Sequence, residues 1–115
     1  MLLRPRPLIA DALLDQIEEE FRSSRKFEKY RVSGKAIFFP SGFAWKYLPL
    51  SEITQIKRVV RLIESENGVC PYAEEAPGLR IHFRDQTDIL EVAKEKGVGE
   101  FLQALTEGNP SCVVS

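Results

Sequence analysis

The stretch KAIFFPSGFAWKYLPL, which runs from Lys35 to Leu50, is the most aromatic part of the chain. Pro40-Ser41-Gly42 interrupts it, and these residue types are typical of a tight turn. After the turn, Phe43, Trp45 and Tyr47 recur at a spacing of two, which is the period of a β-strand. The stretch therefore predicts a β-hairpin that carries the core of a small, mainly β domain.

The whole chain has the length and composition of one globular domain. It has 115 residues, of which 43% are hydrophobic and 29% are charged, as in ordinary soluble domains. No apolar run approaches the roughly 20 residues that span a membrane. Asp11 and Asp15 interrupt the apolar N-terminal segment, which argues against a signal peptide. We therefore expect a cytoplasmic protein whose two cysteines, Cys70 and Cys112, are reduced thiols.

The charges are strongly segregated along the chain although the net charge is only −1. Residues 22–61 are strongly basic, whereas the flanking segments 1–21 and 62–115 are acidic. Such asymmetry indicates either an anionic partner or pairing of basic and acidic strands within the fold. We favour internal pairing, since opposite charges on neighbouring strands are common and each pair contributes little.

The pattern of residues predicts an α+β fold, mainly β, arranged as a bent antiparallel sheet or a partly open barrel of about seven strands. Apolar residues at helical spacing predict an extra N-terminal helix, and a second amphipathic segment ending at a glycine predicts a short C-terminal capping helix. The predicted parts are a flexible arm at 1–7, a helix at 8–22, a barrel with its helix at 28–107 and a disordered tail at 108–115.

Within this plan, several segments carry clear local signals. Ile53 to Ile63 is expected to be a long strand, and Asn67-Gly68 is a strong hairpin signal after it. Val69 to Tyr72 is a weak strand candidate because it contains a proline, and Ala73 to Gly78 is predicted to be a loop. From Leu79 to Arg84 apolar and polar residues alternate, so that Arg80, His82 and Arg84 are expected to face outward. Further signals predict a strand over 87–92 and a helix over 100–105.

The order of these elements, with AIFFPSGFAWKYLPLSEITQI, LRIHFRDQTDILEVA and VGEFLQAL, resembles the pleckstrin-homology-like superfold, in particular its small bacterial and GRAM-type members. The resemblance covers Tyr30 to Leu105. It implies a bent, partly open barrel capped by the final helix, and a binding role without catalysis, toward lipid headgroups, peptides or sister domains. The turn Ser33-Gly34-Lys35 is less basic than the lipid-binding loops of the family.

Signatures of catalysis or metal binding are sparse, so we expect no enzyme and no cofactor. His82 is the only histidine, and an exposed histidine on a strand is a surface residue far more often than a general base. The spacings typical of metal ligands are missing from the sequence. Gly97-Val98-Gly99 lacks the context of a nucleotide fingerprint, and Cys70 is best explained as a small buried hydrophobic residue.

The basic strands suggest a binding surface. We predict that an anionic ligand, or a lipid or phosphate surface, is bound by residues from two segments, namely Lys57, Arg58 and Arg61 together with Lys29 and Arg31. The predicted function is thus a non-catalytic binding module that docks a protein partner or an anionic surface. The isoelectric point of 5.9 argues against nucleic acid as the partner.

Three alternatives stay open at this stage. A small enzyme or ligand carrier could use the face formed by Arg80, His82 and Arg84. The final residues Cys112-Val113-Val114-Ser115 match a prenylation box, which would make the protein peripheral to a membrane. A homodimer could form through the N-terminal helix or a sheet edge.

Overall fold

The aromatic stretch forms the predicted hairpin at the centre of the first of two sheets. The structure is a computed structural model that describes residues 5–64 and 73–115. In it, β4 (Ala36–Ser41) pairs antiparallel with β5 (Ala44–Pro49). Gly42 in the connecting turn has a φ of 61°, which glycine adopts without steric cost. The hairpin prediction is therefore confirmed.

The first sheet extends this hairpin on both sides, in the order β1-β5-β4-β3-β2. On one side β3 and β2 continue the antiparallel meander, and on the other side the short β1 pairs parallel with β5. Ser33 shapes the β3–β4 turn, because its Oγ accepts the backbone N–H of Ala36 at 3.1 Å and donates to Glu20 Oε1 at 2.9 Å. The bounds are β1 Arg6–Pro7, β2 Arg25–Phe27 and β3 Tyr30–Val32.

The second sheet has the order β8-β7-β6-β9 and follows the first after a short 3-10 helix, η1 (Leu50–Glu52). Its strands β6, β7 and β8 form an antiparallel meander, and β9 joins β6 in parallel. The register shifts once in β6, between Ile53 and Gln55. The bounds are β6 Ile53–Glu64, β7 Ala73–Phe83, β8 Gln86–Glu91 and β9 Val113–Val114.

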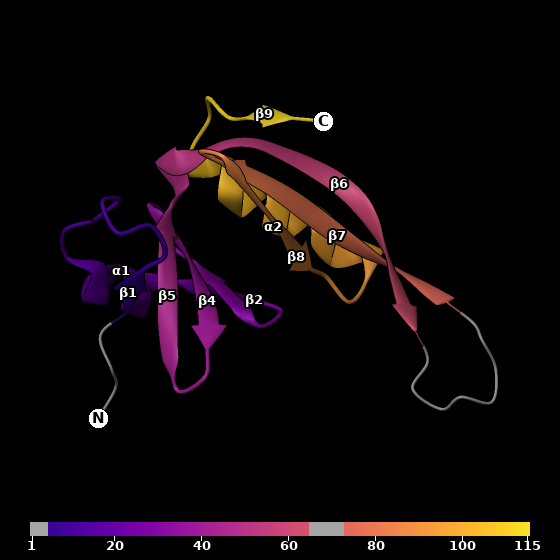
Figure 1. Ribbon diagram of the computed structural model, residues 1–115, viewed down its shortest axis with the longest axis horizontal. Helices are drawn as coiled ribbons and strands as arrows, with labels where there is room; N and C mark the ends of the chain where they lie inside the picture. The colour runs from indigo at the N-terminus through magenta and orange to yellow at the C-terminus, as the bar shows by residue number, and fades with distance from the viewer. Residues whose placement is uncertain (1–4, 65–72) are drawn as a thin grey trace.

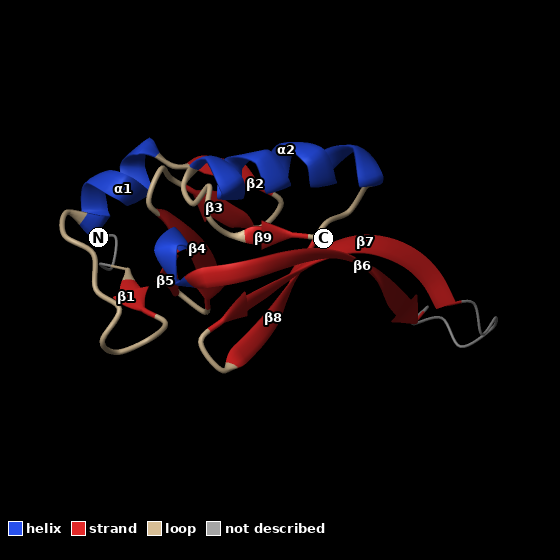
Figure 2. Cartoon of the chain, turned by 90° about the horizontal axis from the view of Figure 1, so that it is seen from above, coloured by secondary structure: helices blue, strands red, loops and turns tan. Residues whose placement is uncertain are grey.

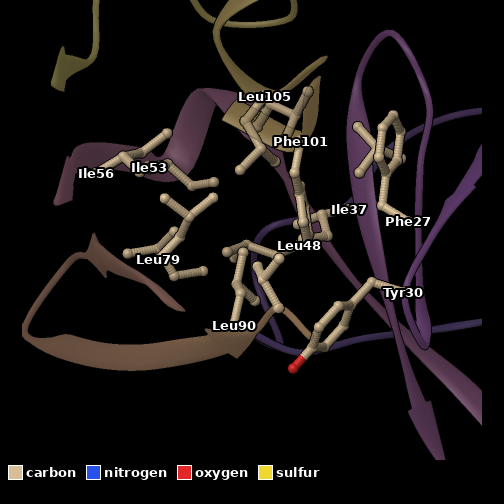
Figure 3. Close-up of a cluster of buried hydrophobic side chains, with 14 of the residues drawn as sticks. Phe27, Tyr30, Ile37, Leu48, Ile53, Ile56, Leu79, Leu90, Phe101 and Leu105 are labelled. Atoms are coloured by element: carbon tan, nitrogen blue, oxygen red, sulfur yellow. The ribbon is translucent and has the colours of Figure 1, made fainter. Parts of the chain in front are cut away.

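The helix α2 (Glu95–Glu107) lies along one face of the second sheet, as Figures 1 and 2 show. Its buried residues Val98, Phe101 and Leu105 meet apolar side chains from both sheets in one core (Figure 3). Phe101 stacks on Phe27 with ring centroids 5.3 Å apart. The core comprises Phe27, Tyr30, Val32, Ile37, Leu48, Leu50, Ile53, Ile56, Leu79, Ile81, Phe83, Leu90, Val92, Val98, Phe101 and Leu105.

Side chains, rather than a strand ladder, join the β2–β3 turn to the end of β8. The Tyr30 hydroxyl accepts the backbone N–H of Glu91 at 3.0 Å, and Glu28 Oε1 accepts the N–H of Ala93 at 3.2 Å. Among the described residues the two sheets form no closed barrel. The chain is thus α+β and mainly β, with two sheets and two helices.

The N-terminal helix is shorter than the predicted segment 8–22. α1 spans only Ile17–Ser23, and Gln16 before it has a left-handed backbone with a φ of 56°. Upstream of it, Leu8 continues the pairing of β1, since its N–H donates to the Tyr47 carbonyl at 2.8 Å. The apolar spacing that suggested one long helix therefore arises from residues that pack separately, with Ile9 against the main core and Ile17 against a second cluster.

The predicted loop over 73–78 is instead the first part of β7. Pro77 lies within the strand opposite Val60. Its carbonyl accepts the N–H of Val92, so the backbone of Pro77 faces away from β6, past the last paired residue of β8. A missing N–H costs no ladder hydrogen bond at that position.

The C-terminal segment also differs from the predicted helix over 100–105 and disordered tail over 108–115. α2 is longer at both ends, although Gly108 caps it as predicted. The tail is held by Asn109, whose Nδ2 donates to the carbonyls of Leu50 and Ile53 at 2.7 and 2.8 Å, and it ends in β9. The turn at Asn67-Gly68 and the strand candidate at 69–72 lie outside the described residues.

Candidate functional site

The second sheet has one covered face and one open face. On the covered face Ile56, Leu79, Ile81 and Leu90 are almost fully buried. Residues at paired register positions share a face, so the open face carries the alternate set. It consists of Gln55, Lys57, Val59 and Arg61 on β6, Arg80 and His82 on β7, and Thr87, Ile89 and Glu91 on β8.

Two of the predicted anion-binding residues, Lys29 and Arg31, are engaged within the fold. Lys29 Nζ lies 2.8 Å from Glu91 Oε2. Their hydrogen bond raises the pKa of Lys29 and lowers that of Glu91. Arg31 donates from Nε and Nη2 to the hydroxyl and carbonyl of Ser24 and lies over the ring of Phe21. Lys29 therefore joins the β2–β3 turn to β8, and Arg31 joins β3 to the end of α1 and the residue that follows it.

Arg61, on the open face, also uses its side chain for contacts within the fold. Its Nε donates to the carbonyl of Pro77 and its Nη2 to the carbonyl of Val92, both at 2.8 Å. The side chain reaches across β7 at Gly78, where an added Cβ would lie 3.1 Å from Arg61 Cδ and from the Leu90 carbonyl oxygen. The absence of a side chain at Gly78 thus makes room for this arginine.

The other two candidates, Lys57 and Arg58, lie exposed on β6 and point to opposite faces of the sheet. Arg58 Nη1 is 4.0 Å from Glu95 Oε1, with both side chains more than half exposed. Lys57 makes no hydrogen bond or ion pair with another described residue. Arg61 is likewise 4.0 Å from Glu91. The pairs Arg58–Glu95 and Arg61–Glu91 thus connect the basic middle of the chain with its acidic C-terminal part.

Of the alternative face formed by Arg80, His82 and Arg84, only the first two residues stay together. Arg84 lies in the β7–β8 turn and pairs with Glu52 and Asp11, at 3.0 and 2.6 Å. These hydrogen bonds, chiefly that with Glu52, raise the pKa of the Arg84 guanidinium. Arg84 therefore attaches the N-terminal segment to the sheet, whereas Arg80 and His82 lie on the open face.

The far half of β6 has a free edge. β9 and Ser115 occupy the outer edge only near its start, where the Arg58 N–H donates to the Ser115 carbonyl at 3.2 Å. Beyond that point, no other strand of the described residues pairs with this edge, and the β6–β7 ribbon extends past α2 (Figure 1). Backbone groups alternate in direction along a strand, so Val60 and Leu62 direct theirs outward.

The side chains at this edge are apolar and exposed. Val60 is 66% exposed and Leu62 is 70% exposed, on the face that α2 covers further along the sheet. A small pocket of about 160 Å³ lies beside them, between the start of α2 and the ribbon. It is lined by Arg58, Val59, Val60, Pro77, Gly78, Glu95 and Val98. Sequence patterns identified the strand but not its free edge, because strand order is not visible in them.

A larger, open groove of about 640 Å³ lies at the other end of the molecule, where β1 and β5 meet the segment before α1. Trp45 and Tyr47 line it together with Leu13 and Ile17. Trp45 also packs against Phe21 of α1, with centroids 5.2 Å apart. Of the three alternating aromatic residues that predicted the hairpin, Trp45 and Tyr47 therefore line this groove and pack in the second cluster, whereas Phe43 is fully exposed.

The two valines of the formal prenylation box form β9 of the second sheet, and Cys112 lies just before that strand. Cys112 is a half-buried free thiol whose pKa is raised by burial. Val113 and Val114 pair with β6, and the Ser115 N–H donates to the Ile56 carbonyl at 3.0 Å. A prenylating enzyme would have to detach this segment from β6 before it could reach the thiol.

Comparisons with known proteins found no protein-family model, no curated protein and no solved structure that matches this chain. Among the described residues, no group of three histidine, cysteine or acidic side chains is placed to hold a metal ion. No helix in the described ranges is long and apolar enough to cross a membrane.

Proposed function

We propose that this chain is a non-catalytic binding module of the pleckstrin-homology-like type, which docks an extended segment of a protein partner along β6. Three features support the family assignment. β2 to β5 form one antiparallel meander, β6 to β8 form a second, and α2 follows and packs on the second sheet. Those are the arrangement and the order of elements that the superfold implies.

The observation that carries the docking proposal is the free outer edge of β6 from Val60 onward. Unpaired backbone groups on an exposed strand are a template for another strand. Many binding domains use such an edge, where main-chain hydrogen bonds supply affinity and neighbouring pockets select alternate side chains. The pocket beside Val60 and Pro77 is placed to select one apolar side chain of the docked segment.

The two faces of β6 define the chemistry of that segment. Toward α2, the docked strand would lie beside Val60 and Leu62, which favours apolar residues. Toward the open face, the nearest exposed cation is Lys57, just before the unpaired stretch, and it favours an acidic residue in the docked strand. The Arg61 guanidinium is directed across β7 and contributes only its charge. A partner segment with alternating apolar and acidic residues therefore complements the strand in both hydrophobicity and charge.

The contacts of the basic residues favour a protein segment over an anionic membrane surface. Lys29, Arg31 and Arg61 all donate hydrogen bonds within the fold, so they are poorly available to lipid headgroups. Surface attraction to anionic lipid depends on several free cations acting together. Strand addition depends instead on the β6 backbone, which these internal contacts leave open.

The test is a titration of the isotope-labelled chain with a short peptide of alternating valine and glutamate, followed by amide NMR signals. We expect saturable shifts centred on Val60 and Leu62, because their backbone groups would bond the peptide. A peptide of alternating valine and lysine is the matched ligand, and it should bind at least tenfold more weakly because of repulsion by the basic strand.

The variants place lysine at exposed apolar positions of β6 and of β8, which lie on either side of β7. The double variant Val60→Lys/Leu62→Lys should abolish binding, since an edge lysine blocks strand addition. Ile89→Lys, on β8, should leave it unchanged. Equal binding of the peptide by both variants, or no shift at Val60 in the unaltered chain, would contradict the proposal. A concentration-dependent dimer without peptide would show that a second copy occupies the edge instead.

A further inference from the structure

The open face of the second sheet carries two neighbouring cations, which suggest an anionic ligand. On the open face, Lys57 of β6 and Arg80 of β7 are directly opposite each other in the register. Residues so placed have Cβ atoms about 5 Å apart, and like charges there are destabilising. Neither side chain forms an ion pair with a carboxylate of the described residues. Glu91, the acidic residue of this face, is already paired with Lys29 at 2.8 Å.

Arg80 carries the more specific signal. The residue is partly buried, and its Nε is fully buried without any hydrogen-bond partner in the structure. A buried donor without a partner is unfavourable, more so when it belongs to a charged group. The guanidinium also differs from that of Arg61, the nearby arginine on the same face, which donates to two carbonyls. Arg80 is thus a partly buried cation that donates no hydrogen bond to another described residue. Because its Nε is fully buried, a ligand would be bound by its two terminal Nη groups.

Other donors adjoin this pair on the open face. His82 is the next residue of β7 on this side, opposite Gln55 of β6 and Thr87 of β8. An imidazole, a carboxamide and a hydroxyl can each donate to an oxygen atom. Gln55 Nε2 donates one of its two hydrogens to Ser115 Oγ at 3.3 Å, which leaves the other for a ligand. The register therefore gathers two cations and three polar donors around one area of a sheet that α2 does not cover (Figure 2).

We propose that Lys57, Arg80 and His82 form a binding site for a phosphate group on the open face of the second sheet. A phosphate dianion carries as many negative charges as Lys57 and Arg80 carry positive ones. Its oxygens can accept the guanidinium fork and the ammonium group at once. A carboxylate has fewer oxygens and half the charge, so it would leave part of this donor set unused.

The site shares Lys57 with the β6 strand, but it can be tested separately from strand addition, because Arg80 and His82 lie on β7 and Val60 and Leu62 point to the opposite face. The experiment follows amide NMR signals during titration with inorganic phosphate, at constant ionic strength and with chloride as the reference anion. We expect saturable shifts centred on Lys57, Arg80 and His82, with a dissociation constant on the order of millimolar. Arg80→Leu should weaken binding at least tenfold, and Lys57→Met severalfold.

The control is Lys26→Met, which removes an exposed lysine of β2 and changes the net charge by the same amount as Lys57→Met. It should leave phosphate binding unchanged. Phosphate should also raise the melting temperature of the unaltered chain but not of Arg80→Leu, which reports on the site independently of the signal assignments. Equal shifts in the unaltered chain and in Arg80→Leu would overturn the proposal.

A second arm identifies the source of the phosphate group. The chain is mixed with phosphatidylcholine vesicles that contain or lack phosphatidic acid, whose headgroup is a phosphate monoester. Sedimentation that requires phosphatidic acid and is lost in Arg80→Leu would assign the site to a lipid headgroup. Binding of inorganic phosphate without vesicle binding would assign it to a soluble phosphate compound. Failure of both arms would overturn the site while leaving the peptide result at Val60 unaffected.

Discussion

The two sheets of this protein differ in how completely they are covered. The first sheet has packed side chains on both faces, since Phe38 and Tyr47 meet α1 on one side while Ile37 and Leu48 enter the main core on the other. The second sheet is covered on one face only, and its β6–β7 ribbon extends beyond the helix (Figure 1). Among the described residues, the second sheet therefore combines an open face with an unpaired strand edge, whereas both faces of the first sheet are covered.

Because of this difference in coverage, we expect the residues that stabilise the fold and the residues that bind a ligand to lie in different parts of the molecule. Substitutions where α2 ends against η1 and the first sheet should unfold the chain, because packed groups there have no room to relax. Substitutions on the open face or the ribbon should change stability little, because their side chains contact few others. Substitutions in the two regions should therefore differ clearly in their effect on the free energy of unfolding.

Gly108→Ala should cause the largest loss, about 3 kcal/mol of the free energy of unfolding, as overpacking against rigid neighbours does. A Cβ at this position would overlap Leu50 Cδ1 and lie 2.7 Å from the carbonyl oxygen of Gly34. That oxygen belongs to a tight turn and cannot move aside as a flexible side chain can. Urea unfolding followed by circular dichroism measures the effect.

Gly99→Ala is the matched control in the same helix. No atom lies within 4 Å of a Cβ at Gly99, and replacing a helical glycine by alanine typically stabilises by about 0.5–1 kcal/mol. The two substitutions should therefore act in opposite directions. A loss of stability in both variants would show that the end of α2 is not specifically packed.

Asn109→Ala should cost about 2 kcal/mol, the usual effect of leaving buried polar groups unpaired. Its side chain is the donor that reaches the carbonyls of Leu50 and Ile53, and it connects the end of α2 to the start of the second sheet. Thermal unfolding by calorimetry gives the difference. Gln103→Ala, which removes an exposed amide of the same helix, should change the unfolding free energy by less than about 0.5 kcal/mol.

Asn109 also shows which parts of the fold the sequence could predict. The β4–β5 hairpin, the alternation from Leu79 to Phe83 and the glycine stop at Gly108 were predicted because each depends on neighbours along the chain. The ordered tail was not, since Asn109 bonds carbonyls more than fifty residues away. Local residue types cannot indicate such a contact.

Some features of the candidate site could likewise be predicted from the sequence, and others could not. The basic character of β6 is visible in the sequence, and Lys57 and Arg58 are exposed there. That Arg61 is engaged and Arg80 is unpartnered follows from the register of β6 and β7 and from Gly78. The free edge follows from strand order. No local pattern indicates it, because the exposure of Val60 and its position opposite Pro77 depend on the pairing of β6 with β7.

Arg61→Met should lower stability by about 1 kcal/mol, because two hydrogen bonds from the guanidinium to backbone carbonyls are lost while the side-chain stem is retained. Lys57→Met, on the same strand and face, should change stability by less than about 0.5 kcal/mol. Chemical unfolding of both variants tests whether two neighbouring cations differ as their contacts do. Equal effects would mean that charge alone, rather than hydrogen bonding, determines the contribution of this face.

The smallest effect is expected at the contact between the two sheets, in the ion pair of Lys29 and Glu91. Both side chains are about half exposed, so Glu91→Gln should cost only about 0.5 kcal/mol at neutral pH and low salt. The pKa of Glu91 is lowered in the folded state. The pair therefore stabilises the fold fully above the unfolded pKa of the carboxyl, and this contribution is lost as the pH falls through the lowered value.

Unfolding free energies of the unaltered chain and of Glu91→Gln should thus converge in acid and also in high salt, which screens exposed charges. Glu100→Gln, which neutralises an exposed carboxylate of α2, is the control for net charge and should show a smaller difference at neutral pH. A Glu91→Gln difference that persists in acid would mean that Glu91 acts through packing rather than charge. The polar contacts between the β2–β3 turn and the end of β8 would then be the hydrogen bonds of the Tyr30 hydroxyl and of Glu28. These bonds go to the backbone N–H groups of residues 91 and 93, so they do not depend on the ionisation of Glu91.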